Sequence, residues 1–268
     1  MNIENNSILN IHLNPEGILR IVLNNPKSHN TLSEKMILSL QQSLDDAASD
    51  EKVRVVIIAA EGSTFSAGHD LKEMKAGRLD PDKGKSYFNK IMSQCSTLMQ
   101  SIVTNPKPII AEVNGTATAA GCQLVASCDL AYASVSARFA TPGVNIGLFC
   151  STPMVALSRS VANKHSMEML LTGEFISSDK AAQIGLINEN VKDESLQKYV
   201  LEKAIIISQK SKMTLKTGKK AFYKQLELTL SQAYEFASDV MVNNMLKLDA
   251  EEGIDAFLEK RKPSWQDK

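Results

Sequence analysis

The sequence predicts an α/β fold in which strand–strand–helix units repeat and a helical region follows. Short runs of β-branched and apolar residues alternate with helical periodicity as far as Val191, and helical periodicity then dominates from Glu194 to Lys260. The length of 268 residues suits one core with an appended segment. We therefore expect an α/β core at residues 1–191 and a C-terminal helical region at residues 192–268.

The first predicted unit is a hairpin followed by a helix. Two β-rich runs, Ile8–Leu13 and Leu19–Leu23, flank a Pro-Glu-Gly sequence at residues 15–17 that is typical of a turn. Thr31, with a glutamate three residues later, has the spacing of a capping box. Apolar residues then recur at helical intervals up to Ala48, which predicts a helix.

Two further units follow the first. The apolar run Val53–Ala60 predicts a buried strand, residues 66–70 a loop, and the apolar spacing at residues 88–102 a helix. A third strand is predicted at Ile109–Val113, and an Asn-Gly turn leads from it toward a helix that begins near Ala120.

The pattern changes in the last part of the chain. Leu130–Ala133 predicts one more strand, and helices are expected to start at Thr152 and at Ser177, with Gly185 as a C-terminal stop. The lysine-rich stretch Lys210–Lys224 is interpreted as the solvated face of a helix.

The charge balance and the absence of certain motifs exclude several function classes. Lys and Arg together number 30, as do Asp and Glu, so no net charge attracts nucleic acid or an anionic membrane. The apolar stretches are shorter than a membrane-spanning helix requires. No glycine-rich nucleotide-binding motif and no serine-hydrolase elbow occurs. We expect neither nucleic-acid nor membrane partners.

The N-terminus and the cysteines favour a cytoplasmic location. Residues 1–6 lack the basic start and apolar core of a secretory signal, and the first arginine is Arg20, which argues against a transit peptide. The four cysteines show no C-x-x-C spacing and the four histidines are scattered, so neither a zinc site nor a disulfide framework is indicated. We therefore expect no metal and a reducing, cytoplasmic setting.

Two stretches of small residues, 66–71 and 114–124, each follow a predicted strand. Small residues let the backbone approach a ligand, and at a strand-to-helix junction they expose unpaired N–H donors at the positive end of the helix dipole. Two such loops side by side form an oxyanion hole. Ordinary close packing explains the same spacing, so the pattern alone leaves both interpretations open.

Several motifs, spread in order over nearly the whole chain, resemble the enoyl-CoA hydratase/isomerase, or crotonase, family. They lie at Asn24–Lys27, Phe65–Asp70, Lys107–Ala111, Asn114–Ala117, Ala120–Cys122, Phe139–Pro142, Glu168–Gly173, Ala182–Leu186 and Glu251–Lys262. The resemblance implies a ClpP-like spiral of ββα units with a C-terminal helical region that serves oligomerisation, in homotrimers or hexamers. It also implies an acyl-CoA thioester as the ligand, with coenzyme A as part of the substrate and no separate cofactor.

Site residues are implied by the same resemblance. Matched by position, the backbone N–H groups of His69 and Ala120 hold the thioester oxygen. Lys260 matches a lysine that reaches the nucleotide phosphates of a neighbouring subunit. The positions implied to contact substrate or coenzyme A are Lys27, Ser28, Ala67, Gly68, Asp70, Leu71, Thr116, Ala119, Pro142 and Lys260.

The resemblance does not extend to the acid/base pair of the hydratases. Two glutamates place and deprotonate water in those enzymes, and their positions hold Gln123 and Gly143 in this sequence. An amide orients water but exchanges no proton near neutral pH, and glycine has no side chain. The position of one carboxylate of dienoyl-CoA isomerases holds Ser151. We predict an acyl-CoA enzyme of lyase or isomerase type that stabilises a thioester enolate.

Two alternatives stay open beside this hypothesis: an enoyl-CoA hydratase, as the family name implies, and a non-catalytic acyl-CoA-binding protein. The run Ala67–Asp70 also resembles methylmalonyl-CoA decarboxylase, in which departure of CO₂ generates the enolate. The tyrosine of that enzyme falls near Cys150, so the match is incomplete.

Single residues carry competing interpretations. The His69 imidazole is a possible catalyst, but the alignment assigns the role to the backbone N–H. Cys150 is either a thiolate nucleophile or, in the absence of a basic partner, a small buried residue. Asp70 either caps its loop or contacts the ligand. Glu112 is the only carboxylate expected near the second loop, and its direction is not settled by the pattern of its strand.

Overall fold

The computed structural model describes residues 8–268; the first six residues, on which the targeting prediction rests, lie outside this range. A six-stranded sheet forms the centre, in the order β1-β2-β3-β5-β7-β10. Only β1 is antiparallel to its neighbour. The strands are β1 (Leu9–Leu13), β2 (Ile18–Leu23), β3 (Val55–Ala60), β5 (Ile109–Val113), β7 (Leu130–Ser134) and β10 (Glu189–Val191).

A second, four-stranded sheet consists of short strands in the order β4-β6-β8-β9. Its strands are β4 (Thr64–Ser66), β6 (Thr116–Thr118), β8 (Arg138–Ala140) and β9 (Ile176–Ser177). Because β4, β6 and β8 follow β3, β5 and β7 directly along the chain, each turn of the chain adds one strand to each sheet. The predicted spiral of ββα units is confirmed.

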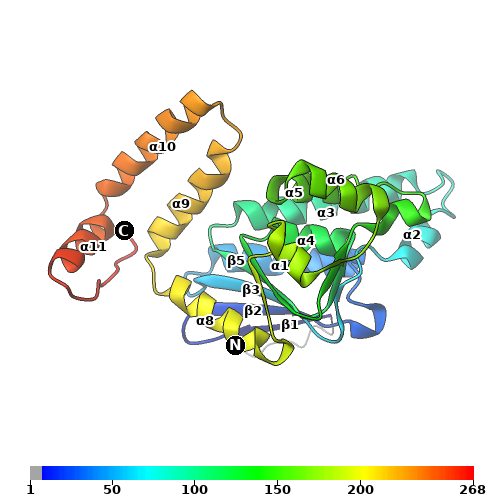
Figure 1. The fold of residues 1–268 in the computed structure, drawn as a ribbon, viewed down its shortest axis with the longest axis horizontal. Coiled ribbons are helices and arrows are strands. Elements are labelled where there is room, and N and C mark those ends of the chain that lie inside the picture. The colour runs from blue at the N-terminus through cyan, green and yellow to red at the C-terminus, as the bar shows by residue number, and fades with distance from the viewer. Residues whose placement is uncertain (1–7) are drawn as a thin grey trace.

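Helices complete the units (Figure 1). They are α1 (Glu34–Ser49), α2 (Leu71–Gly77), α3 (Lys85–Thr104), α4 (Ala120–Ser127), α5 (Pro153–Ser160), α6 (Asn163–Thr172) and α7 (Ser178–Gln183). The starts predicted at Thr152 and Ser177 are confirmed as N-caps of α5 and α7. The capping box predicted at Thr31 is wrong: Ser33 caps α1, because its hydroxyl is the one that accepts from Met36 N–H at 3.2 Å.

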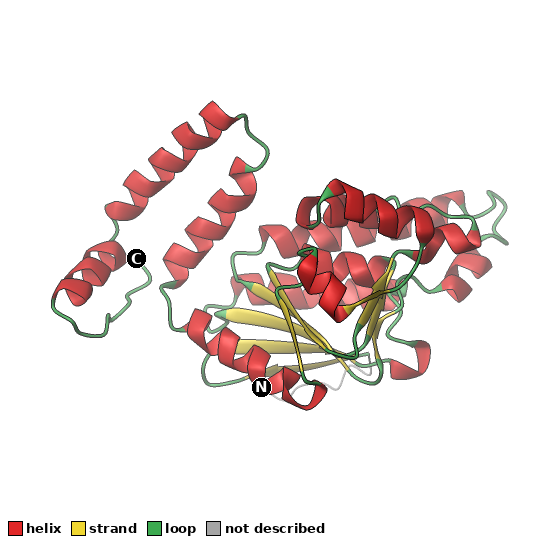
Figure 2. Ribbon diagram, viewed as in Figure 1, coloured by secondary structure: helices red, strands yellow, loops and turns green. Residues whose placement is uncertain are grey.

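Helices lie on both sides of the large sheet (Figure 2), and its two faces belong to two different clusters of buried side chains. The larger core lies between one face and helices α1, α3 and α4. On the other face, Ile57 and Ile110 pack against Val200 and Ala204 of helix α8 (Leu196–Ser208). Helix α8 therefore covers the face of the sheet that is turned away from α4.

The last helices leave the core as an arm (Figure 1). We call helices α9 (Lys212–Gln225), α10 (Leu230–Met245) and α11 (Leu248–Leu258) the C-terminal arm. Neither α9 nor α10 buries a single residue within the described chain. Helix α8 lies after the boundary predicted at residue 191, yet it packs on the large sheet. The division into residues 1–191 and 192–268 stays a prediction.

A partly buried ion pair joins the arm to the core. The ammonium group of Lys219 on α9 donates to the carbonyl oxygens of Ile102 and Lys107 at 2.9 and 3.0 Å, and to the Asp129 carboxylate at 2.7 Å. The hydroxyl of Tyr223, one helical turn later, donates to the same carboxylate at 2.9 Å. Lys219 is an exception to the solvated face predicted for this lysine-rich stretch, because its side chain is only 8% exposed and lies in this ion pair.

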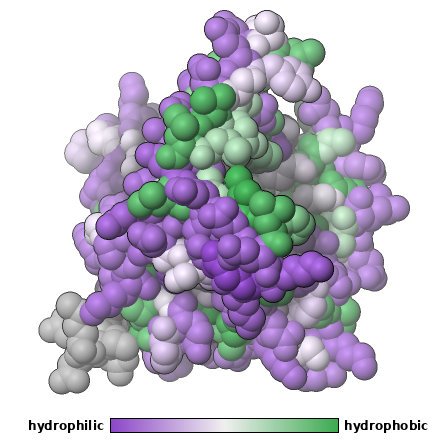
Figure 3. Space-filling model, turned by 90° about the vertical axis from the view of Figure 1, so that its left-hand side faces the viewer, coloured by the Kyte–Doolittle hydropathy of each residue, from purple (hydrophilic) through white to green (hydrophobic). Residues whose placement is uncertain are grey.

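Large apolar side chains are exposed along the arm. Figure 3 shows hydrophobic residues gathered on the end of the molecule where the arm projects. The members on the arm are Phe222, Leu226, Leu230, Tyr234, Met241, Val242, Met245, Leu246, Leu248, Ile254, Phe257 and Leu258. No helix within residues 8–268 has both the length and the apolar content that crossing a membrane requires.

Candidate active site

The two loops of small residues touch each other. A Cβ atom placed on Gly68 would lie only 3.0 Å from the backbone nitrogen of Ala120 and 2.9 Å from the Cβ of Ala119. A Cβ on Gly121 would lie 2.2 Å from the carbonyl oxygen of Ser66. Gly68 also has a φ of +83°, which strongly favours glycine. The structure thus brings together two segments that are about 50 residues apart in the sequence.

Helix α4 begins at this contact. Ala120 is its first residue, so the N–H of Ala120 has no acceptor inside the helix. Ala119 precedes it at φ 50° and ψ −119°, a conformation that costs a non-glycine residue about 1–3 kcal/mol. The N–H of Ala119 donates to the Ala140 carbonyl at 3.0 Å and holds this strained turn against β8. The turn directs the start of α4 toward the loop of Gly68.

His69 supplies the neighbouring N–H group. Leu32 forms a parallel bridge with His69, in which the Leu32 N–H donates to the Gly68 carbonyl at 2.7 Å. Among the backbone hydrogen bonds of residues 8–268, none is donated by the N–H of His69 or of Ala120. Two unpaired donors on adjoining loops, one at a helix N-terminus, form an arrangement that favours a partially negative oxygen.

A polar residue that the sequence analysis missed supports the first loop. The amide of Asn30, which is fully buried, donates to the carbonyls of Glu61 and Thr64 at 2.9 and 2.7 Å. The backbone carbonyl of Asn30 accepts from the Ser66 hydroxyl at 2.8 Å. Asn30 has a φ of 49°, and asparagine after histidine is a recognisable signal for such a left-handed turn.

Asp70 and its neighbours begin helix α2. The Asp70 carboxylate accepts from the backbone N–H groups of Lys72 and Glu73 at 2.8 and 3.4 Å, so Asp70 caps α2. The Thr31 hydroxyl donates to the same carboxylate at 3.3 Å. The cap fixes the direction in which the chain leaves the His69 loop. Of the other predicted contact residues here, Ala67 is half-buried and Leu71 is exposed.

Gln123 lies one helical turn along α4 from the strained turn. Its backbone N–H donates to the Ala119 carbonyl at 3.0 Å, and the residue is only 4% exposed. Within the described residues, its side-chain oxygen is buried without a hydrogen-bond partner. Helical side chains lean toward the N-terminus of their helix, which in α4 is the end that begins at Ala120.

The second position at which hydratases carry a glutamate has no room for a side chain. A Cβ on Gly143 would lie 2.5 Å from the Leu148 carbonyl oxygen and 2.9 Å from the sulfur of Cys150. Burial raises the pKa of the Cys150 thiol, which keeps it protonated near neutral pH. Ser151 is exposed, and its hydroxyl donates to the Phe149 carbonyl at 3.3 Å. A folded-back segment therefore occupies this space.

His69 and Glu112, the two titratable residues considered near the loops, do not form an acid/base pair. Burial lowers the pKa of the His69 imidazole to about 4, so the ring is neutral at physiological pH. Glu112 forms a two-contact ion pair with Arg20 at 2.5 Å. Arg20 lies two residues after Ile18 on β2, and Glu112 lies two residues after Ile110 on β5. Because side chains alternate along a strand, both point to the same face as Ile18 and Ile110, which pack toward helix α8. Glu112 thus points away from α4, which answers the question left open by the strand pattern.

The remaining predicted contact residues are spread around this centre. Thr116 begins β6, and Pro142 begins the 3₁₀ turn Pro142–Ile146; both are half-buried. Lys27 and Ser28 lie in the 3₁₀ turn Pro26–Ser28. Lys260 follows α11 on the arm, so the structure does not bring it to His69 and Ala120 within one chain.

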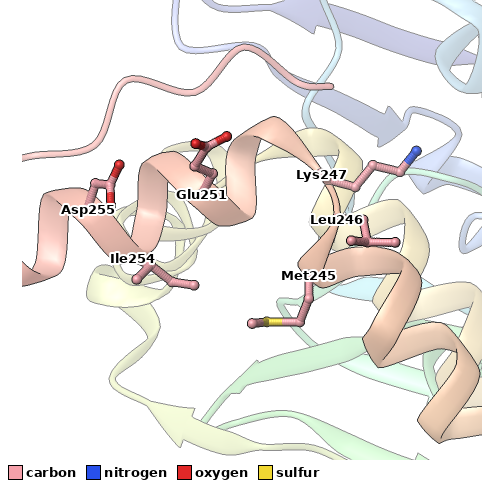
Figure 4. A pocket seen from close by; sticks show the side chains of 6 residues that line it. All are labelled: Met245, Leu246, Lys247, Glu251, Ile254 and Asp255. Carbon is pink, nitrogen blue, oxygen red and sulfur yellow. The ribbon is translucent and has the colours of Figure 1, made fainter.

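A pocket that the sequence analysis did not anticipate lies at the elbow between α10 and α11 (Figure 4). Its lining residues are Met245, Leu246, Lys247, Glu251, Ile254 and Asp255. The side chains of Met245 and Ile254 are directed toward each other across the elbow (Figure 4). None of the predicted site residues lines this pocket, which belongs entirely to the arm.

The chain has a crotonase fold, and two adjoining loops of this fold carry backbone N–H groups that have no backbone acceptor among residues 8–268. The family model for enoyl-CoA hydratase/isomerase matches residues 14–268. The chain therefore belongs to the enoyl-CoA hydratase/isomerase family.

Several relatives are highly similar to this chain. Enoyl-CoA hydratase domain-containing protein 3, mitochondrial, of Xenopus laevis is 50% identical over 249 residues, covering 93% of this chain and 83% of the relative. The crystal structure of the human protein of that name is 48% identical, with a TM-score of 0.91 and coverage of 96% and 100%. A structure described as enoyl-CoA hydratase of Mycobacterium smegmatis is 45% identical, with a TM-score of 0.92 and coverage of 96% and 98%.

The expectation of a cytoplasmic location is contradicted by these comparisons. Five relatives that are 45–50% identical to the chain are named as mitochondrial. Four free cysteines are compatible with any reducing compartment, so cysteine usage does not single out the cytoplasm.

Proposed function

We propose that this protein binds an acyl-CoA thioester and stabilises negative charge on the thioester oxygen with the N–H groups of His69 and Ala120. The reaction class that fits is a lyase or isomerase reaction of the derived enolate, without the hydratase glutamate pair. Coenzyme A enters as part of the substrate. The relatives' names favour a mitochondrial location.

The observation that carries this proposal is the contact between the two loops. The space beside Gly68 is so tight that a Cβ there would lie 3.0 Å from the Ala120 nitrogen, and both flanking N–H groups are unpaired among residues 8–268. Oxyanion-hole donors are typically worth about 2.7–4 kcal/mol each, because charge on the oxygen develops only as the reaction proceeds. Two such donors account for enolate stabilisation without any acidic side chain.

The chemistry at positions 123 and 143 disfavours ordinary hydration. Gln123 exchanges no proton near neutral pH, and Gly143 faces the Leu148 carbonyl rather than open space. Each general acid or base contributes about 10²–10⁴-fold, so the loss of both slows hydration greatly. The alternative of a hydratase is supported by a relative, the 2,3-dehydroadipyl-CoA hydratase of Escherichia coli, which is 30% identical over 252 residues.

The test of the reaction class is turnover of purified protein with a panel of CoA thioesters, followed by mass spectrometry. We expect very slow hydration of crotonyl-CoA and a product from at least one other thioester. Hydration at the rate of an ordinary hydratase would contradict the statement that Gln123 and Gly143 cannot replace the two glutamates. Tight binding with no product across the panel favours the second candidate, a non-catalytic acyl-CoA-binding protein, which the missing proton-transfer groups support.

Self-association is part of the proposal. The arm helices α9 and α10 bury no residue within the described chain and expose many large apolar side chains, as an unpaired interface does. We propose a homotrimer or hexamer in which the arm packs on neighbouring subunits. Lys27 and Ser28 would contact the coenzyme A moiety, and Lys260 would reach the nucleotide phosphates of a neighbouring subunit.

A further inference from the structure

The loop that carries His69 lies along the segment that leads into helix α1. The Ala67 N–H donates to the His29 carbonyl at 3.0 Å, and the Leu32 N–H donates to the Gly68 carbonyl at 2.7 Å. Both segments continue directly into helices, the loop into α2 and the other segment into α1. The position of the loop therefore depends on how these two helices are held together.

Helix α2 has little apolar packing of its own. Of its seven residues only Gly77 is buried, and Met74 packs against the larger core from a half-buried position. A helix of about two turns is not stable without contacts to the rest of the protein. Polar contacts made by its first turn therefore contribute to fixing its position.

The carboxylate of Glu73, in the first turn of α2, makes such contacts. One of its oxygens, Oε2, accepts from the backbone N–H of Glu34 at 2.9 Å and from the Tyr87 hydroxyl at 3.3 Å. Glu34 is the first residue of α1, so its N–H has no acceptor inside that helix and lies at the positive end of the helix dipole. The Glu34 carboxylate itself is paired with Lys90. Glu73 thus joins α1, α2 and α3 at a single oxygen atom.

Tyr87 of α3 contacts both ends of helix α2. A Cβ placed on Gly77 would lie 2.6 Å from Cδ1 of Tyr87, so the ring lies directly against the backbone at the end of α2. Burial, together with the charge of Glu73, raises the pKa of Tyr87 to about 12. The hydroxyl therefore stays protonated at physiological pH and is able to donate to Glu73.

We propose that Glu73 is a positioning residue: the hydrogen bonds of its Oε2 atom fix α2 on α1 and α3, and so hold the His69 N–H where it and the Ala120 N–H reach the same thioester oxygen. His69 directly precedes Asp70, the N-cap of α2, so a shift of α2 moves the His69 N–H with it. The inference rests on the proposed function, because it presumes a thioester oxygen between the two N–H groups. It assigns Glu73 no contact with the ligand.

The test compares two ligands that differ at one carbon: butyryl-CoA, whose acyl chain begins with a carbonyl, and the thioether S-butyl-CoA, which has a methylene there. Isothermal titration calorimetry gives both dissociation constants, and their ratio measures the preference for the carbonyl oxygen. A site with donors for this oxygen disfavours the thioether, which leaves those donors unpaired. We expect the wild-type protein to bind the thioester about tenfold more tightly than the thioether.

The variant Glu73→Ala removes the acceptor, and we expect the preference for the thioester to fall to about threefold or less, because the His69 N–H is no longer held in place. Glu73→Gln keeps an oxygen that is able to replace Oε2, so it should retain a preference of about fivefold or more. A general loss of stability or of coenzyme A binding would weaken both ligands equally. The ratio therefore separates positioning of the N–H group from a merely structural role.

Lys75→Ala is the matched control, since Lys75 is an exposed residue of the same helix. It should keep the wild-type preference. Tyr87→Phe removes only the hydroxyl that donates to Glu73 and leaves the ring in place against Gly77. We expect this variant to lower the preference by about twofold, and it decides the matter if Glu73→Ala does not fold by circular dichroism.

The possible contrary results bear on different statements. A wild-type protein that binds neither ligand, or binds both equally, overturns the proposed function, because no donor then holds the carbonyl oxygen. A wild-type preference that Glu73→Ala retains in full overturns this inference alone and leaves the proposed function standing. The inference is also wrong if Glu73→Gln behaves like Glu73→Ala, or if Lys75→Ala loses the preference to the same extent.

Discussion

Gly68 is the residue at which a single added methyl group should separate the two loops of the site. Its added Cβ would lie 3.0 Å from the Ala120 nitrogen, so Gly68→Ala must push the two N–H donors apart. We expect affinity for a CoA thioester to fall by about tenfold, in keeping with the loss of one hydrogen bond to the thioester carbonyl. The measurement is calorimetric titration of the folded variant.

Gly147→Ala is the matched control for Gly68→Ala. Gly147 has a φ of +76°, so both variants carry similar backbone strain of about 1–2 kcal/mol. Nothing lies within 4 Å of a Cβ placed on Gly147. We expect the control to lose stability but keep its affinity; an equal loss of affinity in both variants would show that strain, not crowding at the two N–H groups, is responsible.

His69 predicts a pH dependence of stability. The pKa of its imidazole is lowered from 6.5 to about 4 by burial, so the unfolded chain binds a proton at this ring more readily than the folded protein. The contribution of the neutral ring to the free energy of unfolding is therefore fully present above about pH 6.5, and it is lost as the pH falls through about 4. The wild-type protein should therefore lose unfolding free energy between pH 7 and pH 4.5. We expect His69→Gln to lose about 1–3 kcal/mol less over the same range.

Urea denaturation at several pH values measures this difference. His12→Gln is the control, because His12 is exposed on the edge strand β1. The control should show the wild-type pH dependence. If His69→Gln shows it too, the His69 ring is not held neutral by burial.

At the residue scale, the resemblance to the family singled out His69 and Ala120, and the structure brings the two loops that carry them into contact. That their N–H groups hold a thioester oxygen stays a prediction. The crowding at Gly143 was not predictable, since it depends on the Leu148 carbonyl that folds back against it. The unpaired oxygen of Gln123 was hidden for the same reason: burial and missing partners are properties of the packed structure.

At the element scale, α9 depends on the buried contact of Lys219 with Asp129. Lys219→Met removes three hydrogen bonds and leaves the carboxylate of Asp129 without its cation. Breaking such a pair typically costs about 3–5 kcal/mol, and we expect a loss of unfolding free energy near the lower end of this range because Asp129 keeps the Tyr223 hydroxyl and the Ile109 N–H. Chemical denaturation measures the loss.

Lys220→Met is the control on the same helix. Lys220 is the next residue and is exposed, so its replacement should change the unfolding free energy by less than about 0.5 kcal/mol. Equal stability of the two variants would mean that the Lys219 contact contributes no net stability and that α9 is attached by other means.

Elements with a clear period were predicted from the sequence, and very short ones were not. The hairpin β1–β2 and the helices α1 and α3 follow their apolar spacing. The strands β4, β6 and β8 have three residues each, too few for an alternation to be visible. Helix α2 has seven residues and a polar sequence, and only its Asp70 cap marks its start.

At the scale of the whole molecule, the arm predicts self-association. Leu246 and Phe257 are 80% and 82% exposed, although large apolar residues are normally covered. We expect sedimentation equilibrium to give the mass of three or six chains. The double variant Leu246→Asp and Phe257→Asp should shift the distribution toward smaller species, whereas Lys220→Met should not. A monomeric wild-type protein would contradict the proposed assembly.

The central claim is that the N–H groups of His69 and Ala120 hold the oxygen of a CoA thioester. A crystal structure of the protein with bound butyryl-CoA tests it most directly. We predict that the thioester oxygen lies about 2.7–3.1 Å from both backbone nitrogens, with the acyl chain passing Gln123. A bound thioester whose carbonyl oxygen lies away from either nitrogen would contradict the account.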